Sequence, residues 1–164
     1  MQLRLRRVIV LACLVLLCAT VASAAAPAAG VAPCSVPVSV LEATFHSTVE
    51  AQRPSKSPVS YSTGSWTAYT CNYSTGSGLV QVEVDTPYTA GNYAEEQRVD
   101  DRPADHYAAV PALSGDKAFV FIADSGDAGT AFLDGRRVLV STLDRKLSLS
   151  KFASLFIAIV KHLG

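Results

Sequence analysis

Residues 68–85 read AYTCNYSTGSGLVQVEVD, and this stretch decides the fold. In its first part, Tyr69, Cys71 and Tyr73 alternate with smaller polar residues, and after a Ser- and Gly-rich middle three valines alternate with Gln, Glu and Asp. Successive side chains of a strand point to opposite faces of the sheet. The stretch therefore predicts a β-hairpin whose second strand has one solvated face. We expect the face that carries Tyr69 and Tyr73 to be the buried one.

Further strands are predicted downstream by short apolar runs, at residues 118–123, 130–133 and 136–143. The Gly-rich segment 124–129 is expected to form a turn between the first two of these strands, because Asp and Gly tolerate turn conformations. Asp134-Gly135 is a strong signal for a two-residue hairpin turn between the last two.

The clearest helical pattern lies near the end of the chain. Apolar residues follow a helical period after a serine, at Phe152, Leu155, Phe156, Ile159, Val160 and Leu163,. A first helix is expected at 38–51, where Ser39 and Glu42 have the spacing of a capping box. Asn92, three residues before Glu95, predicts a short helix at 92–99.

These elements give the order α-β-β-α-β-β-β-α. The predicted class is α+β, with an antiparallel sheet of about five strands. We expect the N-terminal helix and the C-terminal amphipathic helix to pack on that sheet.

The N-terminal segment, residues 1–24, has the features of a signal peptide. Three arginines precede an apolar run at 8–21, and Ala22-Ser23-Ala24 provides a small-residue cleavage pattern. The apolar run is 14 residues long, whereas roughly 20 are needed to span a bilayer. We therefore expect cleavage rather than a permanent membrane helix, and a protein that is secreted or resides in the cell envelope.

Cleavage would leave a flexible linker at 25–33 and a single disulfide-containing domain at 34–164. Residues 1–24 carry three of the 14 basic residues and none of the 14 acidic ones, so the mature domain has a net charge near −3. Such a charge is not that of a basic nucleic-acid-binding protein. A lipid anchor has little support, because Cys18 follows the large residue Leu17, and Cys13, which follows Ala12, would leave only residues 8–12 as the apolar core before it. Membrane contact is expected through the signal segment, and a lipid anchor stays open as a poorly supported alternative.

Two of the four cysteines, Cys34 and Cys71, remain after cleavage. In an exported chain, two cysteines most simply form one structural disulfide. The alternative is a pair of metal-binding or catalytic thiols. A metal site needs three or four ligands, and the chain has neither a Cys-x-x-Cys motif nor a nearby pair of histidines.

No convergent set of catalytic residues is evident. His46, His106 and His162 are the three histidines, and only His106 has an adjacent carboxylate, that of Asp105. The chain contains no Gly-x-Ser-x-Gly nucleophile motif,. We therefore expect no catalytic residue, no metal and no cofactor.

Aromatic residues are concentrated between residues 61 and 93, interleaved with Ser, Thr and Gly; they are Tyr61, Trp66, Tyr69, Tyr73, Tyr88 and Tyr93. This composition is typical of adaptable binding surfaces, although Tyr and Trp are also common in ordinary strands. The candidate binding surface consists of Tyr61, Trp66, Tyr88 and Tyr93.

Three short motifs carry a resemblance to a family. Pro33-Cys34-Ser35-Val36 opens the domain, Cys71-Asn72-Tyr73 lies in its first predicted strand, and Leu113-Ser114-Gly115-Asp116-Lys117-Ala118-Phe119 precedes the second half. In these motifs the chain resembles actinobacterial exported lipoproteins that carry a single cell-envelope domain of unknown function. The resemblance implies a cell-envelope location, and it provides no catalytic residues to transfer.

The sequence thus favours an exported, non-catalytic module that binds an unknown protein or envelope ligand. A first alternative is a secreted inhibitor that blocks an extracellular enzyme with the loop 53–66. A second alternative is a small hydrolase built around His106 and Asp105.

Overall fold

The computed structural model describes residues 32–62, 64–92, 107–114, 118–123, 126–133, 135–143 and 147–164. Several predicted features lie outside these residues: the signal peptide, most of the linker, the pair Asp105 and His106, Tyr93, and all of the predicted helix 92–99 beyond Asn92.

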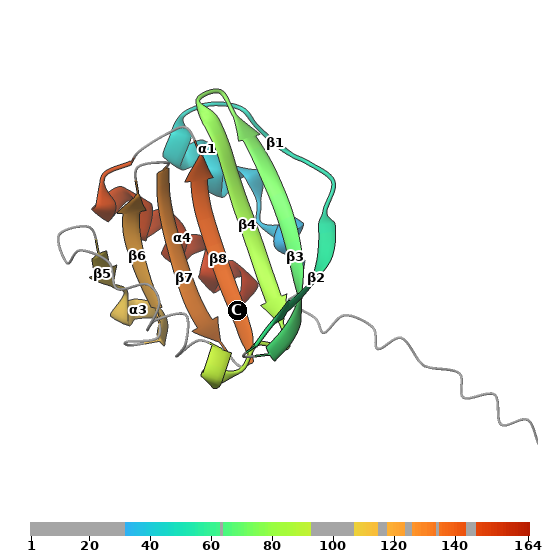
Figure 1. The fold of residues 1–164 in the computed structure, drawn as a ribbon. Coiled ribbons are helices and arrows are strands. Elements are labelled where there is room, and N and C mark those ends of the chain that lie inside the picture. Colours follow the sequence, from blue (N-terminus) through green and yellow to red (C-terminus); the bar gives the residue numbers. More distant parts are fainter. Residues whose placement is uncertain are drawn as a thin grey trace, which may run out of the picture.

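The described strands form one antiparallel sheet of eight strands, in the order β1-β3-β4-β8-β7-β6-β5, with β2 also paired to β3 (Figure 1). The strands are β1 (Val49–Ala51), β2 (Ser55–Tyr61), β3 (Gly64–Thr75), β4 (Gly78–Thr86), β5 (Tyr107–Ala109), β6 (Ala118–Ala123), β7 (Gly126–Leu133) and β8 (Arg136–Leu143). The α+β class and the antiparallel sheet are confirmed. The predicted count of about five strands is wrong, because β1, β2 and β5 were not expected.

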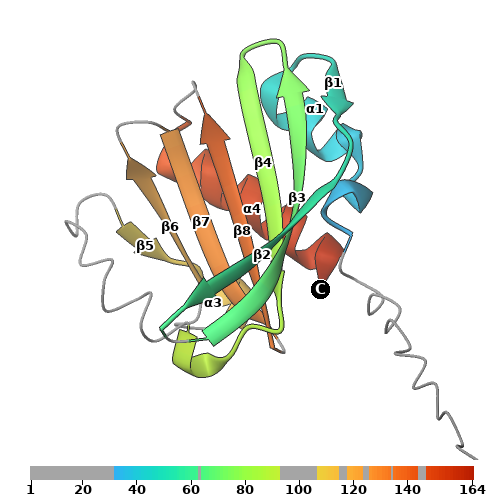
Figure 2. The same ribbon diagram turned by 45° about the vertical axis from the view of Figure 1, so that its right-hand side comes forward.

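The described helices are η1 (Pro33–Ser35), α1 (Val38–Phe45), α3 (Pro111–Ser114) and α4 (Leu149–Leu163). Helices α1 and α4 cover one face of the sheet, which we call the inner face (Figure 2). Fully buried side chains fill the space between the two layers, among them Leu41, Tyr73, Val82, Val140, Phe152, Phe156 and Ile159. None of the described helices covers the opposite, outer face (Figures 1 and 2).

Helix α4 has the predicted position and the predicted cap. The Ser148 side chain accepts a hydrogen bond from the Lys151 backbone N–H at 3.3 Å, which satisfies one of the free N–H groups of the first turn. All six apolar residues of the predicted stripe are buried. The amphipathic pattern therefore identified both the helix and its buried face.

Helix α1 is shorter than the predicted range 38–51. It ends at Phe45 because His46 adopts the left-handed conformation (φ 52°, ψ 39°), and the His46 N–H donates to the Glu42 carbonyl at 2.8 Å. The predicted capping box is wrong, since Pro37 precedes the helix and no side chain caps it. Instead, the Glu42 carboxylate accepts a hydrogen bond from the Val49 N–H at 3.4 Å.

The next helical turn begins at Ala90, not at Asn92. Thr89 is its cap, because the Thr89 hydroxyl accepts a hydrogen bond from the Asn92 N–H while the Asn92 side-chain oxygen accepts one from the Thr89 N–H, both at 3.1 Å. This reciprocal pair is a capping box with Asn in the place of Glu. Asn92 is therefore the third residue of the turn rather than its cap.

The segment 126–129, expected as a turn, belongs to β7. The hairpin of β3 and β4 does turn where predicted, at Gly76-Ser77. Cys71 and Tyr73 lie on the inner face and are fully buried, which confirms the expected buried face. Trp66 and Ala68 are also buried, although they lie on the outer face.

Cys34 and Cys71 form the expected disulfide, with a Cα–Cα distance of 5.2 Å. It joins the 3-10 turn η1 to the middle of β3. Beside it, the Tyr73 hydroxyl donates to the Pro33 carbonyl at 2.7 Å. The Gln52 carbonyl oxygen lies 3.4 Å from one sulfur and 3.6 Å from the other. The start of the domain is thereby fixed to both β3 and its neighbouring edge strand.

A β-bulge separates β1 from β2. Ala51 is opposite Tyr73, whereas Ser55 is opposite Thr70. Three residues of the edge chain, Gln52–Pro54, therefore face two residues of β3, which is the signature of one inserted residue.

This extra residue reverses which side chains face inward. Val49 in β1 is buried on the inner face, while Val59 in β2 lies opposite Trp66 and packs against it on the outer face. In a regular strand, two residues whose numbers differ by an even amount, such as Val49 and Val59, would share a face. The bulge therefore allows Val49 to join the core while Val59 and Tyr61 face outward.

Candidate binding site on the outer face of the sheet

Three aromatic residues from separate segments meet at one end of the outer face and form what we call the aromatic cluster: Tyr61 of β2, Trp66 of β3 and Tyr88 after β4. The Tyr61 and Trp66 rings stack, with centroids 5.5 Å apart and an interplanar angle of 22°. Trp66 meets Tyr88 edge to face, at 4.9 Å and 72°. Both arrangements are favourable for aromatic pairs.

Exposure differs sharply within the aromatic cluster. Tyr88 is 2% exposed and Trp66 is 9% exposed, whereas Tyr61 is 67% exposed. The Tyr88 N–H donates to the Gly135 carbonyl at 2.7 Å, which fixes this residue to the turn between β7 and β8. Tyr61 is therefore an exposed ring stacked on the buried Trp66, which Tyr88 contacts in turn.

Arg137 of β8 lies beside the aromatic cluster. Its guanidinium carbon is 5.0 Å from the centroid of Tyr88 and 6.0 Å from that of Trp66, within the range of cation–π contacts. The Arg137 Nε donates to the Asp85 carboxylate at 2.6 Å, and its terminal nitrogen pairs with Glu83 at 3.3 Å. The Asp85 side chain is fully buried, and Arg137 offsets its charge.

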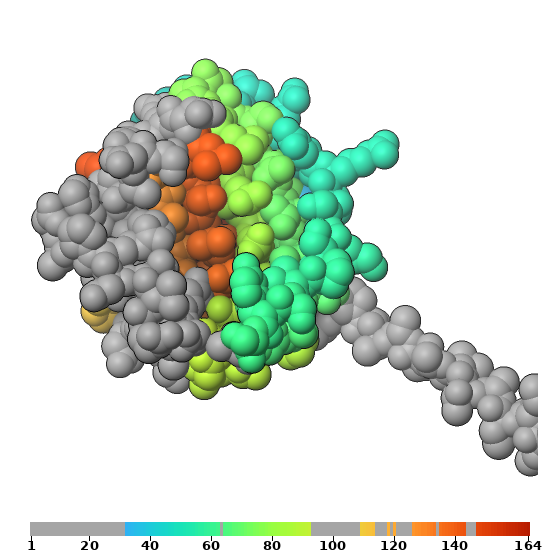
Figure 3. All heavy atoms as spheres, in the orientation of Figure 1, coloured from blue at the N-terminus to red at the C-terminus, as the bar shows by residue number. Residues whose placement is uncertain are grey.

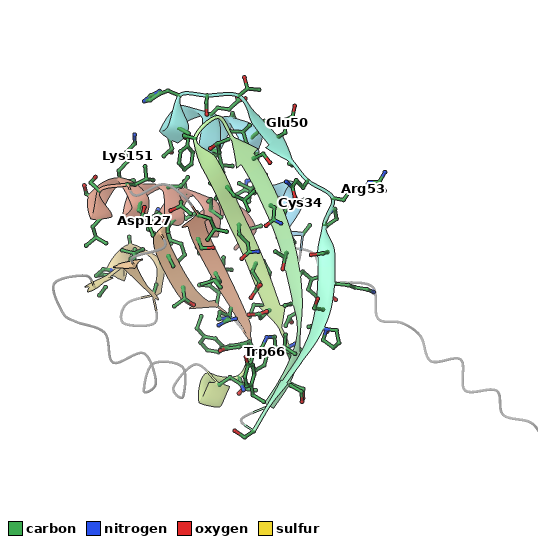
Figure 4. The ribbon with its side chains drawn as sticks, turned by 45° about the horizontal axis from the view of Figure 1, so that its top comes forward. Cys34, Glu50, Arg53, Trp66, Asp127 and Lys151 are labelled. Carbon is green, nitrogen blue, oxygen red and sulfur yellow. A yellow bond between two sulfur atoms is a disulfide. The ribbon has the colours of Figure 1, made fainter. Side chains whose placement is uncertain are left out.

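Alternation places these charged residues on the same face as Trp66. In the sheet register, Ala68 lies opposite Asp85, and Asp85 lies opposite Arg137. The aromatic cluster and the ion pair therefore form one continuous feature across β3, β4 and β8. Figure 4 shows Trp66 at one end of the sheet, with Asp127 and Lys151 at the other end.

A polar row continues from the aromatic cluster along the outer face; it consists of Thr70, Asn72, Gln81, Glu83 and Ser141, all half-buried. The Thr70 hydroxyl donates to Glu83 at 3.3 Å, and the Gln81 amide donates to Asn72 at 3.3 Å. In Figure 3, side chains of β8 and β4 form a recessed strip that the hairpin of β2 and β3 borders on one side. The outer face is thus hydroxyl- and amide-rich, with an aromatic end.

The aromatic cluster also contains an unsatisfied donor. In the part of the chain that the structure describes, the buried Nε1 of Trp66 has no hydrogen-bond partner. Unsatisfied buried donors are uncommon in proteins because their desolvation is costly. The Trp66 indole is therefore held in place by ring packing rather than by hydrogen bonding.

Of the predicted binding residues, the structure brings Tyr61, Trp66 and Tyr88 together. Tyr93 lies outside the described residues. Arg137 and Asp85 were not predicted as site residues. The alternating polar residues of 81–85 indicated a polar face, but only the register of β4 against β8 places Arg137 beside the two acids among them.

The remaining predicted features lie elsewhere. The segment 53–66, expected as an inhibitory loop, consists largely of β2 and the start of β3. His46 ends α1, and the His162 Nε2 is 2.9 Å from the Ser35 carbonyl oxygen. Among the residues that the structure describes, no group of three His, Cys, Asp or Glu side chains is placed to hold a metal ion. None of the described helices is both long and apolar enough to cross a membrane.

No protein-family model, curated protein or solved structure matches this chain. The interpretation of the site therefore depends on its own geometry and chemistry.

Proposed function

We propose that this protein is an exported, non-catalytic binding module, with the aromatic cluster at the centre of its recognition surface. In this proposal residues 1–24 direct export and are removed, and the domain acts in the cell envelope or outside the cell. The disulfide supports export, because disulfides persist mainly in oxidising compartments.

The exposure of Tyr61 is the observation that carries the proposal. A tyrosine ring that is 67% exposed, yet stacked on a buried tryptophan, presents apolar area without the entropy cost of ordering a flexible side chain. Tyr and Trp are enriched at the centres of interfaces for this reason. The surrounding hairpin, rich in Ser, provides adaptable hydrogen-bonding groups.

The test is capture of the native ligand from envelope and culture-medium fractions with the mature domain as bait. Tyr61→Ala removes the exposed ring and should abolish or strongly reduce capture, while leaving the fold intact. Leu143→Ala is the matched control, since Leu143 is an exposed apolar residue (37%) of the same sheet, at the other end of its outer face.

Recovery of the same species with the wild type and Leu143→Ala, but not with Tyr61→Ala, is the expected result. Equal capture by all three proteins would place the recognition surface elsewhere and overturn the proposal. Hydrolysis of a substrate by the purified domain would contradict its non-catalytic part.

A further inference from the structure

The two cysteines of the disulfide differ in their access to solvent. Cys71 is fully buried in the core, whereas Cys34 is only partly buried against it. Figure 4 shows Cys34 beside β3, at the side of the sheet where β1 and β2 form the edge. A thiol from solvent therefore reaches the disulfide through Cys34.

Thiol–disulfide exchange begins when a thiolate attacks one of the two sulfurs. Attack at the Cys34 Sγ forms a bond between the external sulfur and Cys34 and breaks the bond to Cys71, which leaves with the electron pair and takes up a proton. Attack at Cys71 would require the external thiol to enter the core. One disulfide replaces another, so the exchange needs no further oxidant or reductant.

The carbonyl oxygen of Gln52 is placed to accept a hydrogen bond from the thiol that is released. It lies 3.6 Å from the Cys71 Sγ and 3.4 Å from the Cys34 Sγ. The Gln52 N–H donates to the Asn72 carbonyl at 2.7 Å, which holds this peptide group beside β3. A neutral thiol at Cys71 is therefore compatible with burial, because a buried donor needs an acceptor.

Tyr73 holds the turn η1 against β3 independently of the disulfide. Its hydroxyl is 2.7 Å from the Pro33 carbonyl oxygen and 3.3 Å from that of Val36, on either side of Cys34. Pro33 and Val36 are themselves buried. Exchange therefore opens the disulfide without releasing the start of the domain. Cys71 stays close enough to attack the mixed disulfide and expel the external thiol.

From these observations we infer that Cys34 is a reversible S-thiolation site, at which a low-molecular-weight thiol forms a mixed disulfide while the domain stays folded. Cys71 is the buried thiol that reverses the modification. This inference depends on neither the aromatic cluster nor the proposed function.

The test incubates the disulfide-bonded mature protein with reduced glutathione, stops the exchange with acid and locates the adduct by mass spectrometry of peptic peptides. Under native conditions we expect glutathione on Cys34 and a free thiol at Cys71. In urea, where both sulfurs are exposed, both cysteines should carry adducts. The inference is overturned by a native adduct that is equal or larger on Cys71. It is also overturned if Cys34 shows no native adduct at glutathione concentrations that modify the unfolded protein.

Two single-cysteine variants form a matched pair. In the native state, the Cys34 thiol of Cys71→Ser should react with Ellman's reagent at least about tenfold faster than the Cys71 thiol of Cys34→Ser, because thiol reactivity follows exposure. In urea the two rates should be equal. Equal native rates in two variants that thermal denaturation shows to be folded would contradict the inference. The mapping of the wild type needs neither variant, so it decides the question if one of them does not fold.

Tyr73→Phe tests the reversal. Loss of the hydroxyl should slow re-formation of the disulfide in the glutathionylated protein about fivefold, the value of one net hydrogen bond. Release of glutathione after removal of free thiol measures the rate. Tyr69→Phe is the control, because Tyr69 lies on the same strand and packs against the same core. Equal rates in the wild type and Tyr73→Phe would overturn the reversal mechanism, since η1 would then need no second attachment.

Discussion

Tyr73 connects several parts of the structure through one side chain. It lies on β3 two residues after the disulfide, and its hydroxyl donates to the carbonyls of Pro33 and Val36, at 2.7 and 3.3 Å. The side chain is fully buried, and burial raises the pKa of Tyr73 to about 12. The folded state therefore favours the uncharged form of the Tyr73 phenol.

This pKa predicts a loss of stability in alkaline solution. The pKa is about 10 in the unfolded chain, so the contribution of Tyr73 is complete below pH 10 and is lost as the pH rises toward 12. At pH 8, Tyr73→Phe should be less stable than the wild type by about 1–2 kcal/mol, through the lost hydrogen bonds. At pH 11, this difference should shrink by about 1.4 kcal/mol. Urea denaturation of both proteins at the two pH values measures it, and a constant difference would contradict the raised pKa.

The ion pair of Arg137 and Asp85 predicts a second effect at the residue scale. Arg137→Met retains much of the side-chain volume but removes the ion pair that Arg137 makes with the fully buried Asp85 carboxylate. Loss of one partner from a buried pair costs about 3–5 kcal/mol. Arg53→Met is the matched control, because Arg53 is exposed and points away from the sheet (Figure 4). Equal unfolding free energies for the two variants would show that the ion pair has no structural role.

At the scale of elements, the contact between α4 and the sheet depends on a glycine. A Cβ atom at Gly129 in β7 would lie 2.9 Å from a Val120 methyl group and 3.0 Å from the Phe156 ring. The ring of Phe156 therefore packs directly on the backbone of the sheet. This close approach explains why β7, which is rich in Gly and Ala, lies beneath the helix.

Gly129→Ala should accordingly destabilise the protein by about 1–3 kcal/mol, the range for overpacking a well-filled core. Gly91→Ala is the control, because its nearest contact would be an ordinary 3.6 Å to Thr89, and alanine favours a helical turn. Thermal and urea denaturation compare the two variants. A neutral effect of Gly129→Ala would mean that α4 can shift without cost.

The elements also differ in whether they can be predicted from the sequence. The hairpin of 68–85 and helix α4 were predicted because each has one strongly apolar face. Strand β2 carries almost no buried side chain, so it has no alternation to detect. Val49 has the correct spacing from Phe45 to extend a helix, and only the left-handed backbone at His46 directs it into β1.

The candidate site was predictable only in part, because the position of some of its residues depends on how the strands pair. Tyr61, Trp66 and Tyr88 are near one another in the sequence and could be grouped by composition. Arg137 lies more than 50 residues from Asp85 and Glu83, and its position depends on the pairing of β4 with β8. The bulge at Gln52–Pro54, which determines the face on which Tyr61 lies, leaves no signal in residue types.

At the scale of the whole molecule, the export proposal makes a prediction about mass. The exported protein should begin near Ala25, and its unreduced form should show no free thiol, because Cys34 and Cys71 are joined. Intact-mass spectrometry with and without a thiol-alkylating reagent measures both properties. Cys71→Ser is the control, since it should expose one reactive thiol. A mass that includes diacylglycerol would contradict a protein that is released after cleavage and would show that it carries a lipid anchor.

The contact between His162 and Ser35 has a further consequence for the whole chain. These residues are 127 positions apart, yet the His162 ring nitrogen is 2.9 Å from the Ser35 carbonyl, and Arg136 binds the last carbonyls of α4 beside them. A short peptide could therefore join the two regions without crossing the molecule. Circular permutation becomes feasible, with new ends opened at the exposed Gly76-Ser77 turn. In such a permutant, a protein fused to the new ends would lie at the end of the sheet opposite the aromatic cluster.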